Sequence, residues 1–125
     1  MNSRLHHVAL LSTDPERSAE LFRNLLGARV KVGSASGKGP KEVLALMPGI
    51  ALVFVKAEVT STRTDAHVAI SVSSEELKSC AVKLVQLGLD HQAPRQGGRE
   101  EALYFLDHDN NLFELNAGPA PQSEA

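Results

Sequence analysis

The stretch His7-Val8-Ala9-Leu10 is repeated 60 residues later as His67-Val68-Ala69-Ile70. Each copy is followed by a short polar run and an amphipathic helical pattern, which ends in Leu-Gly at residues 26–27 and 87–88. A single unit of this size buries too little apolar surface to be stable alone, so we expect the two copies to pair. In copies related by a pseudo-two-fold axis, the two histidines would come together.

The first copy begins with an alternating pattern over residues 5–11 that predicts a half-buried strand, with His7 on one face and His6 on the other. Thr13 and Glu16 have the spacing of a capping box and predict the start of a helix, which Gly27 ends. Further strands are expected at 28–32, 42–47 and 50–56, with a Gly/Ser/Lys loop at 33–40.

The second copy has the same order. We expect a strand at 66–72, a helix that begins with a capping box from Ser73 to Glu76, and strands at 102–107 and 111–116. The predicted fold is therefore a single α+β domain of two paired βαβββ modules, forming a curved, partly closed mixed sheet around a metal cleft. Module one covers about residues 4–60 and module two about 65–118, and residues 119–125 form a frayed tail.

Composition excludes several function classes. Hydrophobic residues make up 42% of the chain, which is enough to fill a core. The net charge of −2 without a basic stripe argues against nucleic acid as a partner, and no apolar run approaches the ~20 residues of a membrane helix. Because Cys80 is the only cysteine, we expect a cytoplasmic protein in which this thiol is a small buried apolar group.

A metal site is indicated by the repeat. Glu114 follows His67 by 47 residues, and the same spacing from His7 leads to Phe54. The duplication thus predicts four ligand positions, of which Phe54 cannot coordinate. Three protein ligands, His7, His67 and Glu114, would leave coordination positions open, as in catalytic metal sites. Of the remaining histidines, His91 and His108 are expected in loops without a role.

These residues also carry a family resemblance. The paired His-Val-Ala motifs, the segment 104–107 with Asp109-Asn110, and Leu112-Phe113-Glu114-Leu115 followed by Ala117-Gly118 resemble the vicinal oxygen chelate superfamily, which includes glyoxalase I and extradiol dioxygenases. Within it, the chain is most similar to fosfomycin-resistance proteins of the epoxide-hydrolase branch. The resemblance covers most of residues 5–118.

The resemblance implies a metal-dependent enzyme that opens an epoxide, or a similar small oxygenated substrate, by adding water or a thiol. It implies a homodimer whose sites are shared between chains. His7, His67 and Glu114 would hold a divalent ion, commonly manganese, with zinc, iron, nickel or cobalt as alternatives.

Further site residues follow from the same motifs. Glu42 lies where the family has a general base, and Tyr104 lies at the family's tyrosine position near the substrate. Arg95 matches an arginine that neutralises a phosphonate, and Arg99 could do the same from the glycine loop.

The chain departs from the family pattern where the phosphonate is held: Ala102 replaces a serine, and the neighbouring Glu101 adds negative charge. Two alternatives therefore stay open. One is a metal-independent, drug-binding protein of the bleomycin-resistance type, although such proteins typically lack the ligand triad. The other is a glyoxalase, epimerase or dioxygenase activity. Phe54 disfavours a glyoxalase or an epimerase, because these enzymes usually have a fourth ligand at this position.

Overall fold

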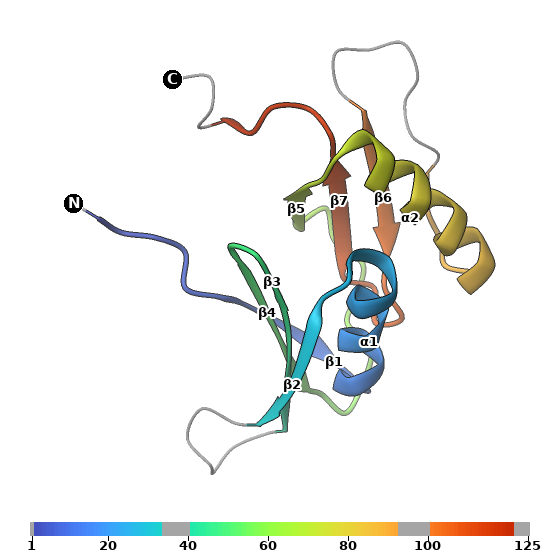
Figure 1. The fold of residues 1–125 in the computed structure, drawn as a ribbon. Helices are drawn as coiled ribbons and strands as arrows, with labels where there is room; N and C mark the ends of the chain where they lie inside the picture. Colours follow the sequence, from blue (N-terminus) through green and yellow to red (C-terminus); the bar gives the residue numbers. More distant parts are fainter. Residues whose placement is uncertain (1, 34–40, 93–100, 122–125) are drawn as a thin grey trace. The chain divides into compact units, whose positions relative to one another are not determined.

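Residues 2–33, 41–92 and 101–121 are described by the structure, a computed structural model. The chain divides into two compact units, Met1–Ser61 and Thr62–Ala125. In each unit the strands form one mixed sheet, and a single helix accompanies that sheet (Figure 1). The expected α+β class is confirmed, and hydrogen bonding divides the strands into one sheet for each unit.

Unit 1 contains β1 (Val8–Ser12), α1 (Pro15–Leu26), β2 (Arg29–Gly33), β3 (Glu42–Met47) and β4 (Ile50–Lys56). The strand order is β1-β4-β3-β2, with β1 parallel to β4 and the other pairs antiparallel. Helix α1 packs against β3 and β4, on one face of this sheet.

The two faces of the first sheet differ because side chains alternate along each strand. The face toward α1 is the core, where the ring of Phe22 stacks on that of Phe54 with centroids 6.0 Å apart. The opposite face carries Glu42, Leu44 and Val53, which line a pocket. The alternation therefore separates the packing residues of this unit from the residues available for chemistry.

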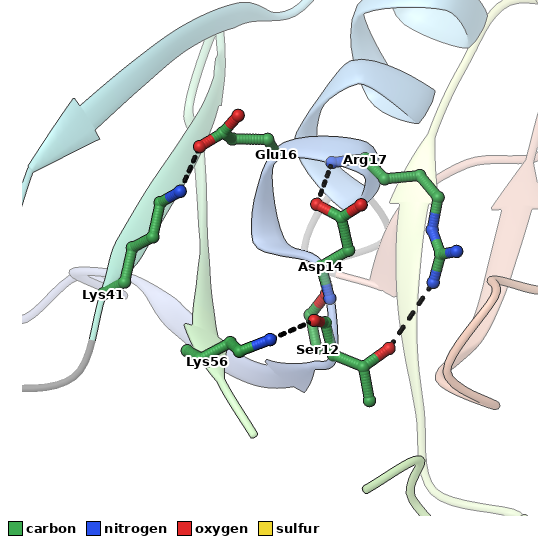
Figure 2. A network of polar contacts seen from close by, with 7 residues as sticks. Ser12, Asp14, Glu16, Arg17, Lys41 and Lys56 are labelled. Atoms are coloured by element: carbon green, nitrogen blue, oxygen red, sulfur yellow. Dashed lines mark hydrogen bonds and ion pairs between the residues drawn. The ribbon is translucent and has the colours of Figure 1, made fainter. Parts of the chain in front are cut away.

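Helix α1 begins one residue later than the sequence pattern indicates. Its N-cap is Asp14, whose carboxylate accepts a hydrogen bond from the backbone N–H of Arg17 at 3.2 Å. The predicted capping box from Thr13 is wrong because Pro15, at the first helical position, makes Asp14 the last residue outside the helix. Glu16 instead pairs with Lys41 (Figure 2).

Unit 2 contains β5 (His67–Ser71), α2 (Ser74–Leu87), β6 (Ala102–Leu106) and β7 (Leu112–Asn116), with strand order β5-β7-β6. Where unit 1 has β2, the described residues of unit 2 have a single bridge between His91 and Phe105. Backbone hydrogen bonds on either side of this bridge, from Gln92 to Tyr104 and from Leu106 to Asp90, show that residues 90–92 follow β6. His91, expected in a loop, therefore takes part in sheet pairing.

The helix of unit 2 agrees with its sequence signals. Ser73 and Glu76 form both hydrogen bonds of the capping box, and Gly88 ends the helix in the left-handed conformation with φ 67°. Cys80 is fully buried on the inner face of α2, as expected. In the described part of the chain, neither helix is long and apolar enough to cross a membrane.

Candidate metal centre and active site

Three candidate site residues meet on one face of the second sheet. Tyr104 and Glu114 are direct register partners on β6 and β7, and His67 lies at the start of the neighbouring strand β5. The Nε2 atom of His67 is 3.5 Å from Oε1 of Glu114. Two ligand atoms that bind one metal ion at a right angle, with bonds of roughly 2.1 Å, lie ~3 Å apart. The separation of His67 Nε2 and Glu114 Oε1 is therefore suitable for both atoms to bind the same ion.

The imidazole of His67 is fixed in the tautomer that a metal ligand needs. Its Nδ1 atom lies 2.9 Å from the backbone oxygen of Asp65. A carbonyl oxygen can only accept, so Nδ1 carries the proton and donates. Whenever the ring is neutral, its lone pair is therefore on Nε2, the atom that faces Glu114.

Glu114 is held from its other side. Gly118 donates its backbone N–H to Asn116 Oδ1 at 2.7 Å, which orients the amide of Asn116. The Nδ2 atom of Asn116 then donates to Glu114 Oε2 at 2.9 Å. The second oxygen, Oε1, therefore remains directed toward His67.

The carboxylate of Glu114 is kept ionised although only 12% of its side chain is exposed. Burial by itself raises the pKa of this group, but hydrogen bonds from Tyr104 and Asn116 and the charge of protonated His67 outweigh it, so the pKa lies below its ordinary value. When a cation takes the place of the proton on His67 Nε2, this carboxylate and the imidazole form a donor set that suits a divalent first-row ion.

Tyr104 contacts both of these residues. Its side chain hydrogen bonds with Glu114, and its ring meets that of His67 edge to face, with centroids 5.9 Å apart. The same residue also lines a pocket of about 490 Å³ in unit 2, where Arg63 is paired with Asp90 at 2.8 Å. Tyr104 therefore links the candidate ligands to a cavity.

His7 and Glu42 share a second pocket, of about 310 Å³, within unit 1. Its floor is the apolar face of the sheet, and Lys31 and His6 complete the lining. The prediction that His6 lies on the face opposite His7 is wrong, because both side chains line this pocket. Strand β1 begins only at Val8, so no strand pairing enforces the alternation at residues 6 and 7.

The fourth ligand position of the repeat falls on a different residue from the one that sequence spacing indicates. Ala69 pairs with Glu114 in unit 2, and the corresponding Ala9 pairs with Val53 in unit 1. Val53 faces the pocket, whereas Phe54 is fully buried in the core. The prediction of Phe54 is wrong because the first copy is one residue shorter between its histidine and the glycine that ends its helix, with 20 positions from His7 to Gly27 and 21 from His67 to Gly88. A one-residue slip turns every side chain to the other face.

Of the predicted site residues, the structure brings together His67, Tyr104 and Glu114, and separately His7 and Glu42. Neither unit, within its described residues, gathers three His, Cys, Asp or Glu side chains in a metal-binding cluster by itself. Arg95 and Arg99 lie outside the described residues. Sequence reasoning missed Asn116, although its position two residues after Glu114 on one strand was a usable signal.

Comparison with known proteins identifies the family. The sequence model of the Glyoxalase/Bleomycin resistance protein/Dioxygenase superfamily matches residues 4–115. The chain belongs to this superfamily. Its predicted membership is thereby confirmed.

Other superfamily members match over nearly the whole chain. The fosfomycin resistance protein FosX of Listeria monocytogenes is 29% identical over 122 residues, covering 94% of this chain and 92% of that protein. The metallothiol transferase FosB of Lysinibacillus sphaericus is 27% identical over 121 residues, covering 91% and 82%. A crystal structure of a mutant Listeria FosX with Mn(II) and 1S,2S-dihydroxypropylphosphonic acid superposes with a TM-score of 0.81 at 28% identity, covering 100% of both chains.

Proposed function

We propose that this protein is a divalent-metal-dependent enzyme that opens an epoxide, or a similar small oxygenated substrate, by adding water or a thiol. The observation that carries the proposal is the pairing of His67 Nε2 with Glu114 Oε1 at 3.5 Å. A hydrogen bond to the other nitrogen of His67, and another to the other oxygen of Glu114, orient these two atoms toward each other. The similarity to FosX and FosB over the length of the chain supports the reaction class.

The proposed ligands are His7 of unit 1 and His67 and Glu114 of unit 2. We propose that the protein is a homodimer whose sites are shared between the two chains. The manganese in the FosX structure supports manganese as the ion. When bound, the ion would act as a Lewis acid on a substrate oxygen. We also propose the cytoplasm as the location.

Glu42 is the proposed general base for the addition of water. It lines the same pocket as His7, so its carboxylate can accept a proton from a water molecule that attacks a substrate held there. Tyr104 holds Glu114 by its hydrogen bond and thereby maintains the orientation of that ligand.

The lining of the unit 1 pocket suggests the class of substrate. Leu44, Val53 and Val55 provide an apolar floor, and Lys31 provides a positive charge beside it. We propose a small substrate with an apolar body and an anionic group, which Lys31 binds. Arg95 and Arg99 remain proposed as further contacts for this anion.

Metal analysis of the purified protein is the first test. Wild-type protein loaded with Mn²⁺ and desalted should retain a near-stoichiometric ion, and His67→Ala and Glu114→Gln should each lose it. Lys78→Ala, which changes a residue of α2 outside the candidate centre, is the matched control. Undiminished metal in His67→Ala or Glu114→Gln would remove these residues from the site.

Turnover of fosfomycin and of simpler epoxides, with and without added thiol, is the second test. Diol formation without thiol, abolished in Glu42→Gln, supports water as the nucleophile and Glu42 as the base. A thiol adduct whose formation survives in Glu42→Gln identifies the transferase reaction instead. High-affinity drug binding without metal and without turnover would favour the bleomycin-resistance type of protein.

A further inference from the structure

His6 and His7 are in direct contact. Their Nδ1 atoms lie 2.7 Å apart, and their rings meet edge to face with centroids at 5.0 Å and an interplanar angle of 73°. Both side chains line the unit 1 pocket. A separation of 2.7 Å between two ring nitrogens requires a hydrogen bond in which one Nδ1 donates and the other accepts.

This hydrogen bond decides which ring is available to a metal. If His7 donates from Nδ1, the lone pair of its neutral ring is on Nε2, and Nε2 can coordinate. If His7 accepts instead, its proton is on Nε2, and that atom cannot be a ligand. Only the first arrangement is compatible with His7 as a ligand through Nε2.

Unit 2 shows the same arrangement with a different partner. There Nδ1–H of His67 donates a hydrogen bond to the backbone oxygen of Asp65, and Nε2 remains available for coordination. In unit 1 the group at Nδ1 of His7 is a side chain, that of His6. The two histidines of the repeat are thus each held at Nδ1, by unrelated groups.

We infer that His6 is a positioning residue: its Nδ1 accepts the proton of His7 Nδ1 and thereby sets the tautomer and ring orientation in which His7 binds the metal. This inference rests on the proposed function for the identity of the ligand, but the tautomer of His7 can be measured without any metal. Loss of a partner that orients a ligating histidine typically lowers metal affinity about 10- to 100-fold.

Three variants of His6 distinguish the effect of its hydrogen bond from the effect of its side-chain size. His6→Ala removes the acceptor. His6→Asn keeps an acceptor, because Oδ1 of asparagine is attached at the same place as Nδ1 of histidine. In His6→Gln the amide lies one bond farther from the backbone. This variant is the matched control, because its side chain is polar but its oxygen is not at the position of Nδ1.

The first readout is the tautomer of His7 in the metal-free protein, measured by long-range ¹H–¹⁵N NMR of the imidazoles. We expect the Nδ1–H form in wild type and His6→Asn, and a shift toward the Nε2–H form in His6→Ala and His6→Gln. A wild-type His7 with its proton on Nε2, or a tautomer that does not change in His6→Ala, would overturn the inference.

The second readout is Mn²⁺ affinity, measured by calorimetry. His6→Ala and His6→Gln should bind about 10- to 100-fold more weakly, and His6→Asn should bind close to wild type. Loss of binding in His6→Ala as complete as in His7→Ala would make His6 a ligand itself and overturn the inference. If wild type binds no Mn²⁺, the proposed function fails, while the NMR result still decides the role of His6.

Discussion

The imidazole of His67 and the carboxylate of Glu114 face each other at 3.5 Å, and each is held by a hydrogen bond on its far side. The backbone of Asp65 fixes the proton of His67, and Asn116 fixes one oxygen of Glu114. Because these supports are local, within two residues of each group, the pair is preorganised by unit 2 alone.

The pairing predicts a pH dependence of stability in the metal-free protein. The folded pKa of Glu114 is lowered, since the hydrogen bonds and the His67 charge outweigh burial. Its stabilising contribution is therefore present above the ordinary pKa of 4.5 and is lost as the pH falls through the folded value. Urea unfolding of wild type and Glu114→Gln at neutral pH and at about pH 4 should show the wild type losing more stability. Parallel losses in both proteins would contradict the prediction.

The register of β4 predicts that the same substitution destabilises the protein to very different extents at two adjacent positions. A glutamate at position 53 points into the pocket beside His7, whereas at position 54 it replaces the ring that stacks on Phe22. Phe54→Glu should cost more than the about 3–5 kcal/mol of a Phe→Ala change, because a charge is also buried. Val53→Glu should cost clearly less. Urea denaturation compares the two, and a smaller loss for Phe54→Glu would show that the register is wrong.

Helix α1 provides a test of its N-terminus. Asp14→Ala removes the side chain that accepts from Arg17 N and should cost about 0.5–2 kcal/mol of unfolding free energy. Thr13→Ala removes a hydroxyl that is not the cap and should cost less. Thermal unfolding of both variants is the measurement. A larger loss of stability in Thr13→Ala than in Asp14→Ala would show that Thr13 is the N-cap.

Cys80 should be chemically inert in the folded protein. Burial raises the pKa of its thiol to about 11, with smaller contributions from Lys83, which lowers the pKa, and Glu76, which raises it, and the residue is 0% exposed. The thiol therefore stays protonated at neutral pH, and reaction with a disulfide reagent should be slow and should accelerate strongly in urea. Equal rates in the folded and unfolded protein would contradict this placement.

Lys31 should contribute to binding of an anionic substrate. Lys31→Met keeps most of the aliphatic chain and removes the charge, so KM for an anionic epoxide should rise while that for a neutral epoxide should not. Lys78→Met, the same change on α2 and outside the pocket, is the control. An equal rise in KM for both epoxides would exclude a charge effect.

Much of the fold was predictable because its signals are local. Gly27 and Gly88 end the two helices with positive φ, and the Ser73 capping box begins α2, as expected from a few neighbouring residues. The alternation along β7 placed Glu114 away from the core residue Phe113, which the structure also shows. Local backbone geometry and side-chain periodicity suffice for such predictions.

Two of the wrong predictions, the ligand position at Phe54 and the face of His6, extend a local pattern beyond the range over which it holds. Spacing along the chain indicated Phe54, but the hydrogen-bonded register with β1 selects Val53. Strand alternation does not apply to His6, because strand pairing begins only at Val8.

The sequence by itself determined which side chains are available for metal chemistry and which segments carry them, because residue identity and periodicity are written in the chain. Only the tertiary structure decided the register of the strands, the atom of His67 that faces Glu114, and the contact between His6 and His7. These depend on hydrogen bonds that form once the backbone is folded. Differences of a few tenths of an ångström in donor–acceptor distance decide whether such a bond forms, and sequence spacing does not contain them.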